Sequence, residues 1–131
     1  MVLERKGNDI NMAWEMNSDR PIYTQILEKI QTMIICGVYK PGDKLPSVRE
    51  LASLANVNPN TMQKALQELE DKGLIFTERT NGKFVTNDKK LIQNLKEEYI
   101  KNIAKTYFNS MKLIGISKKD ALDYLQKFKG E

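Results

Sequence analysis

Amide side chains recur along residues 58–67, a stretch that also carries a threonine and a lysine. An amide offers a hydrogen-bond donor beside an acceptor, the pair that matches the edge of adenine in the major groove of DNA. On a helix that turns about 100° per residue, the polar side of this stretch consists of Asn60, Gln63, Lys64 and Gln67. Its apolar side consists of Met62, Ala65, Leu66 and Leu69. The pattern predicts a helix that packs through one side and recognises bases through the other.

Side chains near this stretch could contact DNA phosphates. Thr61 offers a hydroxyl at the start of the predicted helix, where free backbone amides also attract anions. Phosphate contacts are also expected from Lys44, Arg49, Arg79 and Lys83. Each of these cations alone could be an ordinary solvated charge, but together with the amide side they favour DNA binding.

The overall charge does not by itself identify a DNA-binding segment. The chain has a net charge of +4, but residues 21–88 carry eight basic and eight acidic side chains. Residues 89–131 carry ten basic and five acidic side chains. A DNA-binding surface in the middle segment must therefore gather its cations on one face.

Start and stop signals place the amide-rich helix second in a closely spaced pair. Ser47 and Glu50 form a capping-box pattern that begins a helix over 48–55, and Asn56 can end it in a left-handed conformation. Asn58 and Pro59 are a good N-cap and first-turn pair for a helix over 60–72. Two helices this close form a helix-turn-helix.

Further elements are expected on both sides of this pair. A helix beginning at Pro21 and ending at Gly37 precedes it, and the alternation over 12–16 predicts a short strand anchored by Trp14. Strand-like segments over 74–79 and 83–86 flank Asn81-Gly82, a strong hairpin signal. This hairpin would be the wing of a winged helix-turn-helix.

The composition removes several classes of chemistry. The chain has no histidine and one cysteine, Cys36, which we interpret as a buried apolar residue at a helix end. No cofactor or metal site is expected. An enzyme is disfavoured, because neighbouring carboxylates such as Glu97 and Glu98 point apart on a helix. No apolar run is long enough to span a membrane, so we expect a cytoplasmic protein.

The motifs resemble the GntR family of bacterial transcription regulators, and in particular its YtrA-like subfamily. The resemblance is carried by residues 45–52, 57–66, 69–75 and 82–85, which read LPSVRELA, VNPNTMQKAL, LEDKGLI and GKFV. It implies DNA contacts from Arg49, from Asn58, Asn60, Thr61 and Gln63, and from the wing at Gly82 and Lys83. Ser47, inside the first motif, is added to this set. Many family members have an arginine where this chain has Gln63, so the expected base preference shifts away from guanine.

The C-terminal segment predicts two helices. One runs from Asp88 to about Leu113, and a shorter one folds back after Gly115 with Ser117 and Asp120 at its start, giving an antiparallel helical hairpin. The apolar side is too wide for a solvated helix, and dimerisation is expected through Leu95, Tyr99, Ile103, Tyr107, Phe108, Met111, Leu125 and Phe128. Packing onto the same subunit is the alternative.

The sequence thus predicts a mainly α protein with a small β-hairpin wing and a C-terminal antiparallel helical hairpin. The expected division is a leader over 1–19, a winged helix-turn-helix over 20–87 and a dimerisation element over 88–131. The expected function is a regulator, by default a repressor, that binds double-stranded DNA at an inverted-repeat operator as a homodimer. A winged-helix module that binds protein instead of DNA is the alternative. An unidentified small-molecule effector is left open.

Overall fold

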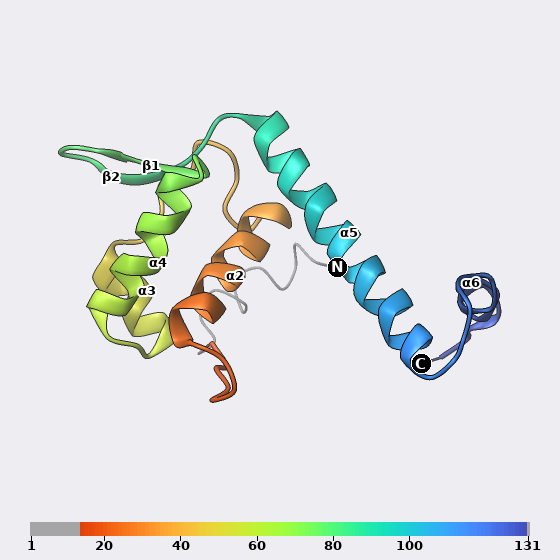
Figure 1. The fold of residues 1–131 in the computed structure, drawn as a ribbon. Coiled ribbons are helices and arrows are strands. Elements are labelled where there is room, and N and C mark those ends of the chain that lie inside the picture. The colour runs from red at the N-terminus through yellow and green to blue at the C-terminus, as the bar shows by residue number, and fades with distance from the viewer. Residues whose placement is uncertain (1–13, 131) are drawn as a thin grey trace. The chain divides into compact units, whose positions relative to one another are not determined.

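The computed structural model describes residues 14–130, in the element order α2, α3, α4, β1, β2, α5, α6 (Figure 1). These residues divide into two compact units, the first ending at Gln93 and the second beginning at Asn94. The predicted fold class, mainly helical with a two-stranded hairpin, is confirmed. Within the described range, no helix is long and apolar enough to cross a membrane.

Helix α2 (Ile22–Ile35) supplies one side of the core. Ile26 and Ile30 of its apolar stripe are fully buried, because their spacing keeps these side chains on one side of the helix, whereas Ile22 in the first turn is exposed. Pro21 precedes the helix as its N-cap, and Gly37 ends the turn after it with a φ of 86°. The prediction for Cys36 is wrong, because this C-cap residue is exposed beyond the apolar stripe, with its Sγ 3.8 Å from the Met33 carbonyl oxygen.

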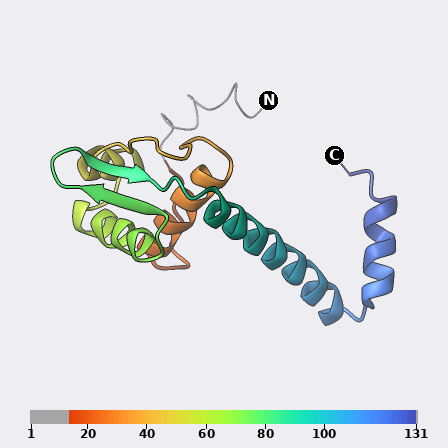
Figure 2. The same cartoon turned by 90° about the horizontal axis from the view of Figure 1, so that it is seen from above.

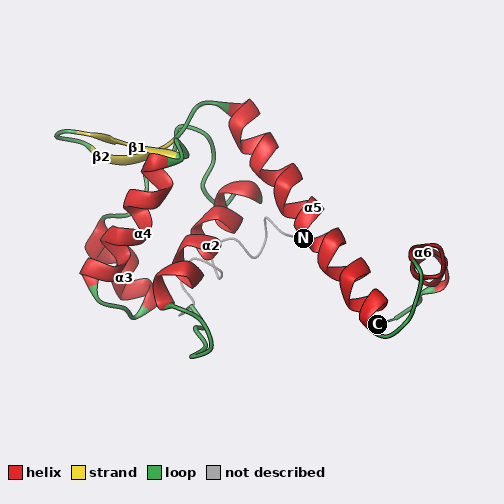
Figure 3. Ribbon diagram, viewed as in Figure 1, coloured by secondary structure: helices red, strands yellow, loops and turns green. Residues whose placement is uncertain are grey.

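Helices α3 (Val48–Ala55) and α4 (Pro59–Asp71) form the predicted helix-turn-helix (Figure 3). The capping box is present, since Ser47 Oγ accepts from Glu50 N at 3.1 Å and Glu50 Oε1 accepts from Ser47 N at 2.8 Å. Asn56 ends α3 with φ 56° and ψ 50°, in the left-handed region. The caps therefore fix where both helices begin and how the chain turns between them.

The wing is an antiparallel hairpin of β1 (Ile75–Glu78) and β2 (Gly82–Val85). Ile75 pairs with Val85 at its base, and both side chains are buried in the core. On the other edge of β2, the connector after α2 adds hydrogen bonds from Leu45 N to Lys83 O at 2.8 Å and from Val85 N to Asp43 O at 2.8 Å. The hairpin is thus held by its base and along one edge.

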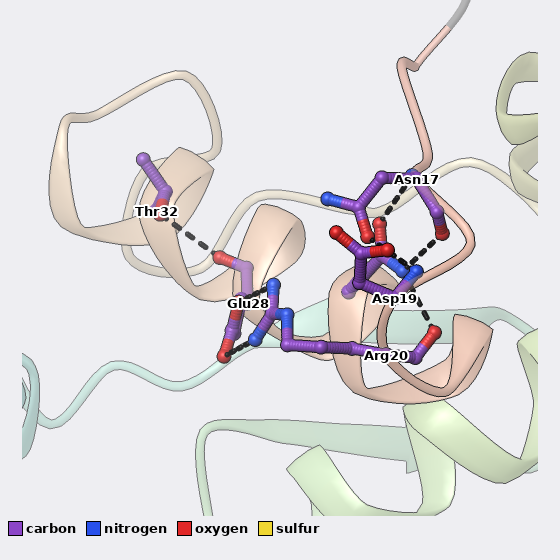
Figure 4. A network of polar contacts seen from close by, with 6 residues as sticks. Asn17, Asp19, Arg20, Glu28 and Thr32 are labelled. Atoms are coloured by element: carbon purple, nitrogen blue, oxygen red, sulfur yellow. Dashed lines mark hydrogen bonds and ion pairs between the residues drawn. The ribbon is translucent and has the colours of Figure 1, made fainter.

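The segment before α2 is bound to that helix by a polar network (Figure 4). Gln25 is buried, and its amide accepts from Asn17 N at 2.9 Å and donates to the carbonyl oxygens of Asn17 and Arg20 at 2.8 and 3.0 Å. Arg20 and Glu28 form a two-fold ion pair with both N–O distances at 2.9 Å, which holds the pKa of the Glu28 carboxyl below its usual value. Trp14 is buried, although residues 14–16 do not form the strand that it was predicted to anchor.

The strand expected over 12–16 is not found in its described part. Residues 14–16 form no strand, and residues 12 and 13 lie outside the described residues. The backbone amide of Trp14 instead donates to the carbonyl oxygen of Leu54 at 3.4 Å, at the end of α3. A helix end offers no row of backbone groups for a strand to pair with.

Helix α5 (Lys89–Leu113) is followed by α6 (Lys118–Lys127), which runs back from the turn at Gly115 and diverges from the end of α5 (Figure 2). Ser117 Oγ caps α6 by accepting from Asp120 N at 3.1 Å. The two helices meet where the Tyr107 hydroxyl donates to the Ala121 carbonyl oxygen at 2.7 Å, and Ala121 is buried there. Large apolar side chains on both helices stay exposed, including Tyr99, Ile103, Leu125 and Phe128.

Candidate nucleic-acid interface

Helix α4 has two chemically different sides. Met62, Ala65, Leu66 and Leu69 are fully buried against α2, α3 and β1. The opposite side is exposed and bounds an open hollow of about 490 Å³, lined by Asn60, Gln63, Lys64, Gln67, Glu68 and Asp71. The four polar residues that sequence reasoning placed on one side of this helix therefore do lie together on one surface.

These four residues differ in the contacts that their side chains already make within the protein. Asn60 and Gln63 make no side-chain hydrogen bond within the described part of the chain, so both amides point their donors and acceptors to solvent. Gln67 Nε2 donates to Asp71 Oδ1 at 3.0 Å. The Lys64 ammonium lies 4.2 Å from the centre of the Tyr23 ring on α2, a cation–π contact. Asn60 and Gln63 are the side chains best prepared to bind a new partner.

The residues at the start of both helices are already used as caps. Asn58 Oδ1 accepts from Asn60 N at 2.7 Å, which leaves the Asn58 amide group as a donor. Ser47 Oγ caps α3 and keeps its own hydroxyl proton as a donor. Thr61, in the first turn of α4, is half-buried. These residues position the two helix N-termini and retain some capacity for an external acceptor.

The charges near α4 are distributed unevenly along it. Its acidic side chains lie in the second half, where Glu68 is 4.0 Å from the Lys72 ammonium and Glu70 is 3.5 Å from that of Lys83. The first turn contains no acidic residue. By contrast, four predicted contact cations have no acidic partner among residues 14–130: Lys44, Arg49, Lys64 and Arg79. A segment that is neutral as a whole thus keeps uncompensated positive charge on α3, on the wing and near the start of α4.

The wing differs in detail from the predicted hairpin. Asn81-Gly82 was expected to form the turn, but the turn is 79–81, and Gly82 pairs with Glu78 as the first residue of β2. Gly82 has a φ of 107°, and a Cβ there would come within 3.2 Å of Lys44 Cε. The positive φ therefore favours glycine here, and a larger residue would also require the flexible end of the Lys44 side chain to move aside. Arg79 is exposed in the turn itself.

Two contacts of this surface were missed by sequence reasoning. Tyr23 holds Lys64, and the Lys83 ammonium lies between Glu70 and the Thr77 hydroxyl, at 3.5 and 2.9 Å. Both contacts join segments that are far apart in the chain or on different elements. No pattern within one segment signals such a contact, so only the folded chain reveals it.

Comparison with known proteins assigns the chain to a family. Residues 22–85 match the family of bacterial regulatory proteins called gntR. The chain is 34% identical over 114 residues to YhcF of Bacillus subtilis, an uncharacterized HTH-type transcriptional regulator, with 87% of this chain and 94% of YhcF covered. It is 48% identical over 73 residues to YtrA of the same organism, an HTH-type transcriptional repressor, with 56% of each chain covered.

Solved structures show the same relationship. A GntR family transcriptional regulator from Listeria monocytogenes superposes with a TM-score of 0.82 at 39% identity, covering 87% of this chain and all (100%) of that one. The DNA-binding domain of AraR in complex with an operator gives a TM-score of 0.52 at 28% identity, covering 56% of this chain and 94% of that one. The chain therefore belongs to the GntR family of bacterial regulatory proteins, which are DNA-binding transcription regulators and not enzymes.

Proposed function

We propose that this protein is a cytoplasmic transcription repressor that binds an inverted-repeat operator as a homodimer, with α4 in the major groove. Residues 20–87 are the DNA-binding domain in this proposal, and residues 88–131 pair two copies. The observation that carries it is the exposed side of α4, where Asn60 and Gln63 have unused amides beside cations without acidic partners. The relationship to the repressor YtrA supports both the role and the YtrA-like subfamily.

The charge distribution favours an approach with the N-terminus of α4 toward DNA. The first turn adds backbone amides and the positive end of the helix dipole to this side, without an acidic residue to repel phosphates. The acidic residues of α4 lie at its other end, where a straight helix leaves the curved groove. Arg49, Lys44 and Arg79 then supply contacts to phosphates on either side of the groove.

Base recognition is assigned to the first two turns of α4. Asn60 and Gln63 can each form a bidentate pair of hydrogen bonds with adenine, whereas an arginine at position 63 would form one with guanine. Asn58, Ser47 and Thr61 add donors near the phosphates. Lys64 and Gln67 lie farther along the same side, and the wing, in which Gly82 begins β2, is assigned to the minor groove.

Dimerisation is assigned to the apolar side chains of α5 and α6. The exposed fractions of Tyr99, Ile103, Leu125 and Phe128 are 45%, 57%, 48% and 57%, a large apolar surface for a solvated pair of helices. The half-buried Leu95, Tyr107, Phe108 and Met111 extend it. A two-fold pair of winged helices would match two half-sites of an inverted repeat.

Selection of DNA fragments by the full-length protein, followed by sequencing, tests the base-reading assignment. The wild type should select an inverted repeat, and Gln63→Ala should lose preference at one position per half-site, with affinity lower by about 1–3 kcal/mol per contact. Gln126→Ala, which removes an exposed glutamine from α6, is the matched control and should select the wild-type sequence. Unchanged preference in Gln63→Ala would contradict the assignment, and failure to select any sequence would favour the protein-binding alternative.

Sedimentation tests the dimer separately from DNA binding. The wild type should sediment as a dimer, and Tyr99→Asp should shift it toward monomer because a carboxylate would be buried in the apolar interface. Asn102→Asp changes an exposed polar residue of the same helix by the same charge and should stay dimeric. A monomeric wild-type protein would refute the pairing through residues 88–131.

A further inference from the structure

Glu70, Thr77 and Lys83 form a closed polar triangle between α4 and the wing. The Lys83 ammonium donates to the Thr77 hydroxyl oxygen at 2.9 Å, and that hydroxyl donates to Glu70 Oε1 at 3.1 Å. The third side is the ion pair between the Lys83 ammonium and Glu70 Oε1 at 3.5 Å. Each of the three residues comes from a different element: α4, β1 and β2.

The triangle lies near the tip of the hairpin. Ile75 and Val85 are paired at the base of the hairpin, in the core, and Thr77 and Lys83 are paired two residues farther toward the tip. Since side chains alternate along a strand, Thr77 and Lys83 project from the same face of the hairpin as the buried Ile75 and Val85. Beyond them lie only the pair of Glu78 with Gly82 and the turn. The triangle thus links α4 to the wing close to the wing tip.

The environment of Lys83 differs from that of the other cations on this surface. Its side chain is 15% exposed and that of Glu70 is 29% exposed, and both partners of its ammonium are intramolecular. Lys44 and Arg79, by contrast, are exposed and lack acidic partners among the described residues. To bind a phosphate, Lys83 would have to leave two partners, and it would expose the carboxylate of Glu70 close to DNA.

We propose that Lys83 acts as a positioning residue that fixes the wing relative to α4, and not as a phosphate contact. The inference rests on the proposed DNA-binding function. A helix in the major groove and a hairpin beside it contact DNA together only if the angle between them is held. The connector holds one edge of β2 and the core holds the base of the hairpin, whereas the triangle joins the wing directly to α4 near the wing tip.

Binding of the full-length variants to an operator fragment selected by the wild type tests this role at several salt concentrations. Thr77→Val removes the central hydroxyl without a change in charge or shape and should weaken binding about threefold to fivefold. Glu70→Gln should weaken binding to a similar extent, although loss of a negative charge near DNA would by itself strengthen it. Lys83→Met should weaken binding and leave the salt slope unchanged, and hydroxyl-radical protection should fade at the positions covered by the wing.

Three controls separate positioning from other effects. Glu68→Gln removes the same charge from α4 without touching the wing and should not weaken binding. Exchanging the charges, with Glu70→Lys and Lys83→Glu together, should restore part of the affinity that each change alone removes. Arg79→Met removes an unpaired wing cation and should lower the salt slope by about one, as a phosphate contact does.

The outcomes are distinct. The proposal is overturned if Glu70→Gln and Thr77→Val bind as tightly as the wild type or more tightly. It is also overturned if Lys83→Met lowers the salt slope by about one, as expected of a phosphate contact. If the wild type selects no operator, the proposed function itself fails before any of these variants is compared.

Discussion

Tyr39 offers a prediction in which removal of a polar group stabilises the protein. Its side chain is buried, with 6% exposed, and its hydroxyl has no hydrogen-bond partner in the described structure. Burial accordingly raises the pKa of Tyr39 above its ordinary value of 10.0, because the charged phenolate is less well solvated there than in water. We therefore expect Tyr39→Phe to fold more stably than the wild type.

The size of the effect follows from the cost of an unpaired buried hydroxyl. Such a group costs about 1–3 kcal/mol in proteins, and the small gap left by the missing oxygen offsets part of the gain. We expect the free energy of unfolding to rise by about 1 kcal/mol, which corresponds to roughly 4 °C in Tm for a domain of this size. Tyr23→Phe is the matched control, because Tyr23 is only half-buried, and its unfolding free energy should stay unchanged.

The pH dependence gives a second measurement on the same variant. A raised pKa means that the unfolded chain loses this proton at a lower pH than the folded protein does. The titration of Tyr39 therefore takes nothing from the free energy of unfolding below the unfolded pKa of 10.0. That free energy declines as the pH rises above this value and through the folded pKa. In Tyr39→Phe this part of the alkaline decline should vanish. Urea unfolding at neutral and alkaline pH measures both effects, and a loss of stability in Tyr39→Phe at neutral pH would refute the unpaired hydroxyl.

Other predictions concern a helix cap, the stability of the protein at acidic pH and one glycine. Ser47→Ala should lower the free energy of unfolding by about 1 kcal/mol in urea titrations, since it removes the cap of α3; an unchanged midpoint would argue against the capping box. The lowered pKa of Glu28 means that its stabilisation is present above the ordinary value of 4.5 and is lost as pH falls through the folded pKa. Acid unfolding of Arg20→Met should lack this contribution, and identical acid profiles would contradict the ion pair. Gly37→Ala should cost about 1 kcal/mol through its φ of 86° alone, because a Cβ there meets nothing within 4 Å; calorimetry showing an unchanged Tm would exclude this.

Sequence reasoning predicted the elements whose signals are local. Ser47, Asn56 and Asn58 act through backbone groups only a few residues away, so their types and spacing were sufficient to place the turn between α3 and α4. The apolar spacing along α2 and α4 likewise predicted which side of each helix is buried. Cys36 was predicted wrongly because it lies one step past the helix, where the spacing rule no longer sets its direction.

The candidate site was predictable as a set of residues but not as a set of contacts. The shared side of Asn60 and Gln63 follows from helix geometry. That Lys64 rests on Tyr23, and that Lys83 bonds to Glu70, depends on how separate elements pack, which no local pattern encodes. The hairpin turn was also predicted slightly out of place, because Gly82 pairs with Glu78 as the first residue of β2 and the turn is 79–81.

The two sides of α4 also bear on how such regulators diverge. The helix is held by its buried residues and by the Asn58 cap, whereas the side chains of Asn60 and Gln63 make no hydrogen bond within residues 14–130. A mutation at either position therefore changes the surface offered to DNA at little cost to folding. A duplicated copy of the gene could acquire a new operator through one or two such substitutions while its protein stays fully folded at every step.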